Sequence, residues 1–280
     1  MEKYCYLNGR ILLLKDAALP LNDIGVLRGF GVFDFLITYN GRPFLFAEHW
    51  RRFCHSAKTL YLKIPLSSQR AAVIVDKLIK KNNLKEATVR LVLTGGESAD
   101  SLHFDPKRPI FFILINQLPH YDRKLYQKGA TVWPIEFQRE LPEAKSNNYV
   151  TAIKFKNAPL PLSKKYKINE LLYHKNGEIF EGATSNFFIF RGRKLITPRA
   201  GVLMGITRNF VLKLAKNKFQ IEERKVKLEE LKKADEAFIT NTTKEILPVV
   251  RVGNIKIGSG RPGQNTKELM ALFKQKIRQL

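Results

Sequence analysis

The sequence has few cysteines and no long apolar run. Among its 280 residues, Cys5 and Cys54 are the only cysteines, and they form neither a C-x-x-C pair nor a pattern typical of secreted, disulfide-rich domains. We therefore expect a reduced protein that needs no disulfide. The N-terminal segment MEKYCYLNGR lacks an apolar signal-peptide core, and no uninterrupted apolar stretch approaches the roughly 20 residues that span a bilayer. These absences favour a cytoplasmic protein without a membrane segment.

Several catalytic motifs are missing as well. The five histidines form no H-E-x-x-H motif and no metal-binding spacing with cysteine, so we expect no metal site. Residues 258–263 have the glycine spacing of a Walker loop, but Gln264 and Asn265 occupy the positions where that loop needs lysine and a hydroxyl residue. Ser101 lacks the G-x-S-x-G context of a serine hydrolase. These observations disfavour a metalloenzyme, a Walker-type nucleotidase and a serine hydrolase.

Acidic residues are scarce relative to basic ones. The chain has 49 Lys and Arg against 25 Asp and Glu, which gives a formal net charge of +24. Such an excess attracts phosphates, anionic metabolites or nucleic acid. Because the basic residues are spread along the whole chain and do not gather in one arm or helix, we favour a solvated cationic surface over nucleic-acid binding.

The apolar residues that are present predict a folded protein. Their share of 44% is typical of globular chains, and 280 residues suffice for one large or two modest domains. Asn8-Gly9 and Asn40-Gly41 are turn pairs of the kind that joins hairpin strands. We expect the first half to contain hairpins over 4–14 and 33–46, helices over 48–61 and 67–83, and strands over 89–94 and 110–115.

A pause in the apolar pattern divides the chain. The pattern stops around residues 117–121, and we place a boundary there that gives domains over 1–118 and 119–280. The mixture of strands and helices predicts an α+β fold. In the second domain we expect strands over 131–137, 170–173, 187–190 and 236–240, and helices over 207–216 and 266–277.

Two segments of the second half have features of a phosphate site. The segment GITR at 205–208 begins a predicted helix, where free backbone N–H groups and the positive end of the helix dipole attract anions. Taken alone, a plain helix start is the simpler interpretation. The segment TNTT at 240–243 follows a predicted strand and offers hydroxyls and amides at a strand end, where ligands of layered folds often bind.

A nucleophilic lysine is harder to identify from the residues. Such a lysine needs a site that lowers its pKa or masks its charge, and many lysines of this chain are candidates. Lys145 differs from the others only in its setting, EAKSNNYVTA, a polar turn that leads into an apolar run.

A series of motifs along the chain resembles one known family. In chain order the motifs are LNGRILLLKDAALPLNDIGVLRGFGVFDFLITYNG, EHWRRFCHSAKTL, AKSNNY, EGATSNFFIF, LMGITR, ITNTTKEILPV and GSGRPGQNTKEL. Each motif alone is weak, but their shared order is specific and extends nearly from end to end. The chain resembles the class IV aminotransferases, the group that contains branched-chain aminotransferases, D-amino-acid aminotransferase and 4-amino-4-deoxychorismate lyase.

This resemblance implies a two-domain α+β enzyme of pyridoxal-phosphate fold type IV that forms a homodimer. Lys145 falls on the family's Schiff-base lysine, which also moves the proton at the substrate Cα. Glu181 falls where the family pairs a carboxylate with the pyridine nitrogen, which keeps the ring protonated and electron-withdrawing. The resemblance assigns further residues to pyridoxal 5'-phosphate: Arg52, Gly205, Ile206, Thr207, Asn241 and Thr242 at the phosphate, Leu203 at the ring face and Tyr149 at the phenolic oxygen.

Departures from the family pattern concern mainly the substrate. Phe33 stands where relatives often carry tyrosine, and Thr243 adjoins the phosphate segment on the substrate side. Arg90 aligns with an arginine of the branched-chain enzymes and is a candidate to bind a carboxylate, with a structural ion pair as the alternative. The stretch from Thr197 to Leu203 is shorter than the family pattern, and Leu203 has a plain core position as its alternative.

The same departures bear on the reaction. The segment TGGESADSLHF lacks the Arg-x-His carboxylate trap of D-amino-acid aminotransferase, which disfavours that subfamily, whereas RPGQNTKEL most resembles the branched-chain enzymes. We therefore expect transamination between a branched-chain or other hydrophobic amino acid and a 2-oxo acid. Elimination of the 4-amino-4-deoxychorismate lyase type is the alternative. A catalytically silent phosphate- or nucleic-acid-binding protein is a third possibility, which the intact set Lys145, Glu181 and Arg52 disfavours.

Overall fold

The computed structural model of the protein describes residues 2–158 and 167–279. The chain divides into two compact units. The first unit comprises Met1–Pro119 with Ala144–Tyr149, and the second comprises His120–Glu143 with Val150–Leu280. The division after Pro119 lies next to the boundary that we placed after residue 118.

The segment Ala144–Tyr149 differs from the sequence-based division, which placed it in the second domain. It belongs to the first unit because backbone hydrogen bonds join it to a strand of that unit. The Phe33 N–H donates to the Lys145 carbonyl over 2.9 Å, and the Asn147 N–H donates to the Gly31 carbonyl over 2.9 Å. Lys145 is therefore part of the first unit's framework.

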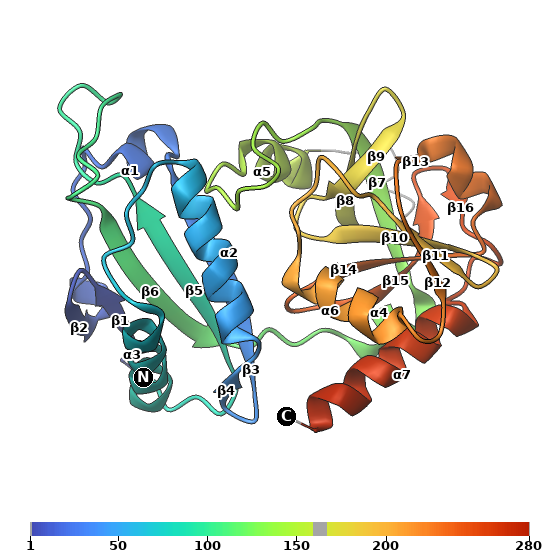
Figure 1. The fold of residues 1–280 in the computed structure, drawn as a ribbon, viewed down its shortest axis with the longest axis horizontal. Helices are drawn as coiled ribbons and strands as arrows, with labels where there is room; N and C mark the ends of the chain where they lie inside the picture. The colour runs from blue at the N-terminus through green and yellow to red at the C-terminus, as the bar shows by residue number, and fades with distance from the viewer. Residues whose placement is uncertain (1, 159–166, 280) are drawn as a thin grey trace. The chain divides into compact units, whose positions relative to one another are not determined.

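The first unit is built on a six-stranded antiparallel sheet in the order β2-β1-β6-β5-β3-β4. Helices α2 and α3 pack against it (Figure 1), and their buried apolar side chains share one core with the strands. Removal of these side chains from water stabilises the unit. Its elements are β1 (Tyr4–Leu7), β2 (Arg10–Leu13), η1 (Leu14–Asp16), α1 (Ile24–Arg28), β3 (Gly31–Tyr39), β4 (Arg42–Pro43), α2 (Phe46–Thr59), α3 (Ser68–Lys81), β5 (Ala87–Thr94) and β6 (Ile110–Gln117).

The turn residues of both predicted hairpins have the expected backbone. Asn8 and Gly9 have φ of 40° and 96°, and Asn40 and Gly41 have φ of 54° and 72°. The prediction of the second hairpin was wrong in its return strand, because β4 ends at Pro43. Leu45 has φ of 49°, which turns the chain, and α2 begins directly after it.

The second unit contains a ten-stranded sheet that closes on itself. Six strands follow one another in the order β10-β14-β15-β7-β8-β9, and β9 pairs again with β10 through Glu181 and Asn186. Figure 1 shows α6 and α7 beside these strands. The elements are α4 (Arg123–Lys128), β7 (Ala130–Glu136), α5 (Val150–Asn157), β8 (Ile168–Lys175), β9 (Glu178–Gly182), β10 (Asn186–Arg191), β11 (Lys194–Thr197), α6 (Ile206–Ala215), β12 (Gln220–Glu223), β13 (Val226–Lys227), η2 (Leu228–Lys233), β14 (Glu236–Asn241), β15 (Glu245–Val252), β16 (Ile255–Lys256) and α7 (Gln264–Arg278).

Strand β10 illustrates why the second unit has two apolar cores. Because successive strand side chains point to opposite faces, Phe187 and Ile189 join one core, whereas Phe188 and Phe190 join the other. The second core is completed by buried side chains of α6 and α7. A strand that is apolar on both faces is thus explained by burial on both sides.

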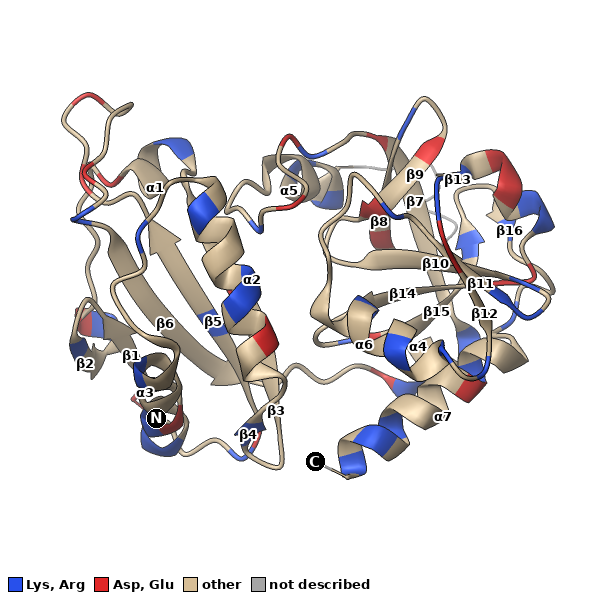
Figure 2. Ribbon diagram, in the orientation of Figure 1, with Lys and Arg blue, Asp and Glu red and all other residues tan. Residues whose placement is uncertain are grey.

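Basic residues occur on helices of both units, α2 and α7 among them (Figure 2). Of the helices in the described ranges, none is long and apolar enough to be a membrane span.

Candidate active site

The candidate residues form two groups, one in each compact unit. The first-unit group contains the lysine and the residues expected to act on substrate and phosphate: Phe33, Arg52, Arg90, Lys145 and Tyr149. The second-unit group contains the expected ring and phosphate residues: Glu181, Leu203, Gly205, Ile206, Thr207, Asn241, Thr242 and Thr243.

Lys145 is anchored through its main chain. Its N–H donates to the hydroxyl of the buried Ser56 in α2 over 3.0 Å, and its carbonyl accepts from Phe33 in β3. Its Nζ lies 4.5 Å from the centroid of the Phe33 ring. The main chain of Lys145 is thus fixed, and its half-buried side chain places the amine beside an aromatic ring.

Phe33 brings three of the candidate residues together. The Tyr149 ring meets it edge-on at 5.6 Å between centroids, and the Arg90 guanidinium carbon lies 4.9 Å from its centroid. Arg90 also lies 4.9 Å from the Phe35 ring. Burial lowers the pKa of Arg90, and the nearby Tyr149 acts in the opposite direction. Arg90 takes part in no salt bridge within the described residues, so the alternative of a structural ion pair is not supported.

Arg52 lies in a buried polar cluster that the sequence analysis did not identify. Its Nε and Nη2 each donate to Asp34 over 2.8 Å, and the Nδ1 of the buried His49 lies 2.6 Å from the same carboxylate. Burial alone would raise the pKa of Asp34, but the charges of Arg52 and His49 and their hydrogen bonds hold it well below its usual range. Burial lowers the pKa of His49, with Asp34 opposing.

This cluster fixes one edge of the Arg52 guanidinium. A guanidinium has five N–H donors, so the pairing with Asp34 leaves donors with which Arg52 can bind a phosphate. A sequence signal was available for Asp34, because a single acid within the apolar strand GVFDFLITY needs a partner when it is buried. His49 and Arg52 are three positions apart in α2, which places both on one helix face.

Glu181 is held in the second unit by two donors. Its Oε1 accepts from Arg139 Nε over 2.8 Å, and its Oε2 accepts from the Leu203 N–H over 2.9 Å. The Leu203 carbonyl in turn accepts from Asn186 Nδ2 over 2.8 Å. The carboxylate is buried and ion-paired, and the backbone of Leu203 is fixed from both sides. Sequence analysis missed Arg139, which belongs to no periodic pattern.

The helix start predicted as a phosphate site has a suitable geometry. Gly205 is the N-cap of α6, and no side chain caps the N–H groups of the first turn. The side chains of Ile206 and Thr207 are buried. A Cβ at Gly205 would clash with Oδ1 of the buried Asn186, so a larger residue would have to displace that side chain. Amide groups at the positive end of a helix favour an anion.

Two buried hydroxyl groups near this helix start lack a hydrogen-bond partner within the described residues. Ser185 Oγ and Thr240 Oγ1 are buried and have no hydrogen-bond partner in the described part of the chain. They belong to neighbouring strand ends, because Asn186 of β10 pairs with Thr240 of β14. Buried polar groups are normally hydrogen-bonded, so such groups are expected to be satisfied by a ligand or by water.

The turn between β14 and β15 contains the other expected phosphate residues. The Lys244 N–H donates to Asn241 Oδ1 over 2.7 Å, which closes the turn around Thr242. The Thr243 hydroxyl lies 3.0 Å from the Tyr121 hydroxyl. The Asn241 side chain therefore shapes the turn, and the Thr243 side chain contacts Tyr121.

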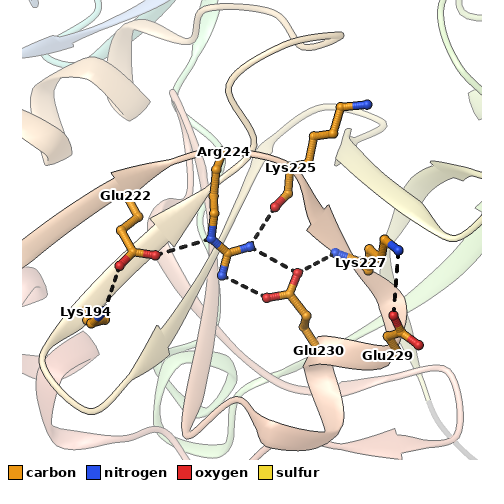
Figure 3. A network of polar contacts seen from close by, with 7 residues as sticks. All are labelled: Lys194, Glu222, Arg224, Lys225, Lys227, Glu229 and Glu230. Carbon is orange, nitrogen blue, oxygen red and sulfur yellow. Dashed lines mark hydrogen bonds and ion pairs between the residues drawn. The ribbon is translucent and has the colours of Figure 1, made fainter.

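The short segment that leads to Leu203 is fixed by a buried arginine. Arg208 in α6 donates to the Pro198 carbonyl over 3.0 Å and to Glu223 over 2.7 Å. Glu223 belongs to β12. Surface ion pairs link β12 to the residues around it (Figure 3). These pairs join Lys194 with Glu222, Glu222 with Arg224, and Arg224 with Glu230.

Each group by itself suits part of pyridoxal phosphate. The second unit offers a carboxylate paired with Arg139, which suits a ring nitrogen, and an uncapped helix start, which suits a phosphate. The first unit offers a lysine with an anchored main chain and an arginine held by a buried carboxylate. Over the ranges that the structure describes, no three His, Cys, Asp or Glu side chains are arranged to bind a metal ion.

Comparison with known proteins agrees with this chemistry. The sequence profile of the family described as amino-transferase class IV matches residues 31–252. This chain belongs to the class IV aminotransferases. The family depends on pyridoxal phosphate, and the resemblance drawn from the motifs is confirmed.

Relatives of this class IV aminotransferase carry different activities. A protein of Methanocaldococcus jannaschii assigned as a branched-chain-amino-acid aminotransferase is 34% identical, over 96% of this chain and 94% of its own. The aminodeoxychorismate lyase of Bacillus subtilis is 31% identical, over 98% of this chain and 95% of its own. The sequence identities to the aminotransferase and to the lyase differ by only three percentage points, so identity alone does not decide between the two activities.

A solved structure confirms the fold class. The Escherichia coli branched-chain amino acid aminotransferase superposes with a TM-score of 0.89 at 27% identity, covering 98% of this chain and 94% of its own. The predicted α+β fold of type IV is therefore correct.

Proposed function

We propose that this chain is a pyridoxal-phosphate-dependent aminotransferase that moves an amino group between a branched-chain or other hydrophobic amino acid and a 2-oxo acid. The observation that carries the proposal is the buried Glu181 carboxylate, held by Arg139 Nε and the Leu203 N–H. A fixed anion of this kind suits a protonated pyridine nitrogen. When bound, pyridoxal phosphate supplies a ring that withdraws electrons from the substrate Cα.

Each unit supplies part of the chemistry. Lys145 Nζ holds the cofactor and removes the proton at the amino-acid Cα, and the Tyr149 hydroxyl binds the phenolic oxygen. The residues that bind the phosphate are Arg52, the start of α6 at Gly205, Ile206 and Thr207, and the turn with Asn241 and Thr242.

The residues proposed to bind the substrate combine an aromatic ring, Phe33, with a cation, Arg90. Phe33 carries no hydroxyl, and its ring contacts both Lys145 and Arg90. Such an arrangement suits a hydrophobic amino acid. Burial of its side chain against the aromatic ring lowers the free energy of the complex, and the arginine pairs with its carboxylate. The Thr243 hydroxyl contacts Tyr121. Thr243 therefore binds the substrate through its main chain in this proposal.

The enzyme works as a homodimer. Large apolar side chains are exposed along a short stretch of the first unit, where Leu21 is 87% and Val26 is 57% exposed, and Leu19 and Leu27 are also exposed. Several large apolar side chains exposed within nine residues are typical of a segment that a partner covers. The double variant Leu21→Asp/Val26→Asp is expected to sediment as a monomer, whereas Val73→Asp on the outer face of α3 is expected to leave the dimer intact.

Visible absorbance and amino-group transfer test the function. Purified protein with added pyridoxal phosphate is expected to develop the absorbance of a lysine-bound cofactor, and Lys145→Ala is expected to lose it. With hydrophobic amino acids and 2-oxoglutarate, the enzyme is expected to form glutamate. A wild-type protein that stays colourless with an unmodified Lys145 would contradict the proposal.

A lyase is the second candidate. The identity of 31% with the Bacillus subtilis aminodeoxychorismate lyase over nearly the whole chain supports it. Elimination of the 4-amino-4-deoxychorismate lyase type releases pyruvate without an amino acceptor. Pyruvate from aminodeoxychorismate, with no glutamate from any amino acid and 2-oxoglutarate, would select the lyase.

A further inference from the structure

The second unit contains a pocket of about 670 Å³ that includes only one of the candidate active-site residues, Thr243. The apolar part of its lining comes from Met270 and the buried Phe273 of α7 and from the buried Ile246 of β15. Pockets of this size accommodate small organic ligands.

The charged part of the lining is mainly basic. Arg123 of α4 and Lys267 and Lys274 of α7 are exposed, and Glu245 is the one carboxylate among the described lining residues. Basic residues of α7 are visible in Figure 2. Within the described chain, none of these three basic side chains forms a salt bridge. Their charge is therefore available to an anionic ligand.

Two tyrosines complete the lining and present flat rings to it. Tyr121 and Tyr126 are both half-buried. Burial, together with Glu245 and Tyr121, raises the pKa of Tyr126, so its hydroxyl stays protonated and donates to the Lys244 carbonyl over 3.2 Å. With their hydroxyls engaged, the two rings offer mainly aromatic surface.

We infer that this pocket is a second ligand site, which binds a small organic anion with a flat apolar body, such as an aromatic carboxylate. The apolar floor and the tyrosine rings receive the body, and Arg123, Lys267 and Lys274 attract the charged group at the entrance. A neutral ligand of the same shape gains nothing from these cations and binds more weakly.

The pocket is connected to the turn that contains Thr242. Tyr121 contacts the Thr243 hydroxyl, and Tyr126 holds the Lys244 carbonyl, so two of the three turn residues are fixed by the pocket wall. A ligand that displaces either ring therefore changes the turn, and this part of the inference rests on the proposed phosphate role of Thr242. Occupancy of the pocket and affinity for pyridoxal phosphate are then coupled in both directions.

The experiment measures binding of indole-3-propionate to the holoenzyme by calorimetry, with indole-3-propionamide as the neutral control. Lys267→Glu/Lys274→Glu reverses the charge at the entrance, and Lys276→Glu changes an exposed lysine of the same helix that does not line the pocket. We expect the double variant to bind the acid roughly tenfold more weakly or worse, as two lost charge contacts imply. Lys276→Glu is expected to bind like the wild type, and the amide is expected to bind the wild type more weakly than the acid does, with an affinity that Lys267→Glu/Lys274→Glu leaves unchanged.

Arg90→Leu separates this pocket from the substrate site, which also attracts carboxylates. Binding that survives Arg90→Leu and fails in Lys267→Glu/Lys274→Glu supports the pocket. Binding that fails only in Arg90→Leu assigns the acid to the substrate site and overturns the inference, as does no binding to the wild type. A double variant that changes the oligomeric state while still binding the acid shows that another copy covers this face, which also overturns it.

Tyr126→Phe tests the coupling. This variant is expected to bind indole-3-propionate, whereas the acid is expected to change its affinity for pyridoxal phosphate less than that of the wild type, because only the Tyr121 contact with Thr243 remains. An effect of the acid as large as in the wild type would overturn the coupling. Calorimetry measures binding of the acid directly and does not depend on transamination. A failure of the proposed function would therefore leave the binding result unchanged.

Discussion

Arg139 places its Nε 2.8 Å from Oε1 of Glu181, although the two residues are 42 positions apart in the chain. The arginine also donates to the carbonyls of Leu141 and Pro142, so it joins Glu181 to the segment that precedes Lys145. The orientation of the Glu181 carboxylate therefore depends on a residue that the sequence analysis did not identify.

Arg139→Leu is expected to lower both stability and cofactor affinity. The substitution leaves the nearly buried Glu181 without its cation, which is expected to reduce the free energy of unfolding by about 2–3 kcal/mol, less than for a fully buried pair. Chemical denaturation and titration with pyridoxal phosphate measure the two effects. Arg193→Leu breaks the exposed pair with Glu268 and is expected to change stability by less than about 1 kcal/mol, with cofactor affinity unchanged. Equal effects of the two variants would contradict the role of Arg139.

His49 is expected to make the protein less stable as the pH falls. Burial lowers the pKa of His49 in the folded state, so between its folded pKa and its unfolded value of about 6.5 the unfolded chain binds more protons. The stabilisation is present above the unfolded pKa and is lost as the pH falls toward the folded pKa. Asp34, whose pKa is also lowered, adds a loss in the same direction at more acidic pH.

Denaturation from about pH 7 to pH 5 measures this dependence. His49→Gln is expected to flatten the dependence in that interval, at a reduced overall stability. His55→Gln, on the exposed side of the same helix, is expected to retain the wild-type slope. A slope that is unchanged in His49→Gln would show that another group is responsible.

Gly205→Ala is expected to weaken cofactor binding. The new Cβ would lie 2.1 Å from Asn186 Oδ1, and Asn186 supports the Leu203 carbonyl, so both the helix start and the ring side are displaced. The expected loss of stability is about 1–3 kcal/mol, as for other overpacked sites. Gly192→Ala, in an open hairpin turn with φ of 55°, is expected to lose roughly 1 kcal/mol without any loss of cofactor affinity.

Arg90→Lys is expected to behave as a disruptive change. The planar guanidinium contacts the rings of both Phe33 and Phe35, which an ammonium cannot reproduce. We expect the KM for 2-oxoglutarate to rise roughly tenfold, while cofactor absorbance is retained. Arg70→Lys, on the exposed face of α3, provides the control and is expected to leave KM unchanged.

The local elements could be predicted because their signals are local. The pairs Asn8-Gly9 and Asn40-Gly41 adopt the positive φ that their turns need, and the helix expected over 67–83 forms as α3 with Ser67 as its cap. The helix predicted over 266–277 extends over Gln264–Arg278. The short helix α4 was missed, because it buries none of its residues and so has no apolar stripe.

The contacts between distant segments could not be predicted in the same way. The phosphate segments were proposed from glycine and hydroxyl spacing, and Gly205 indeed begins α6. The partners Arg139 and Asp34 were missed, because each meets its contact only after separate strands and helices have packed. The pairing of β7 with β15, which the closed sheet requires, likewise leaves no periodic signal in the sequence.

That closure has a consequence for synthesis of the chain. Ala130 of β7 pairs with Val249 of β15, so the closed sheet cannot form until the ribosome has made nearly the whole second unit. Pairings between such distant segments form slowly, because closing a long loop first costs the chain conformational entropy. Strands β7 and β8 therefore stay exposed on one edge until β15 is made, so a nascent chain is expected to remain dependent on chaperones until its last strands emerge.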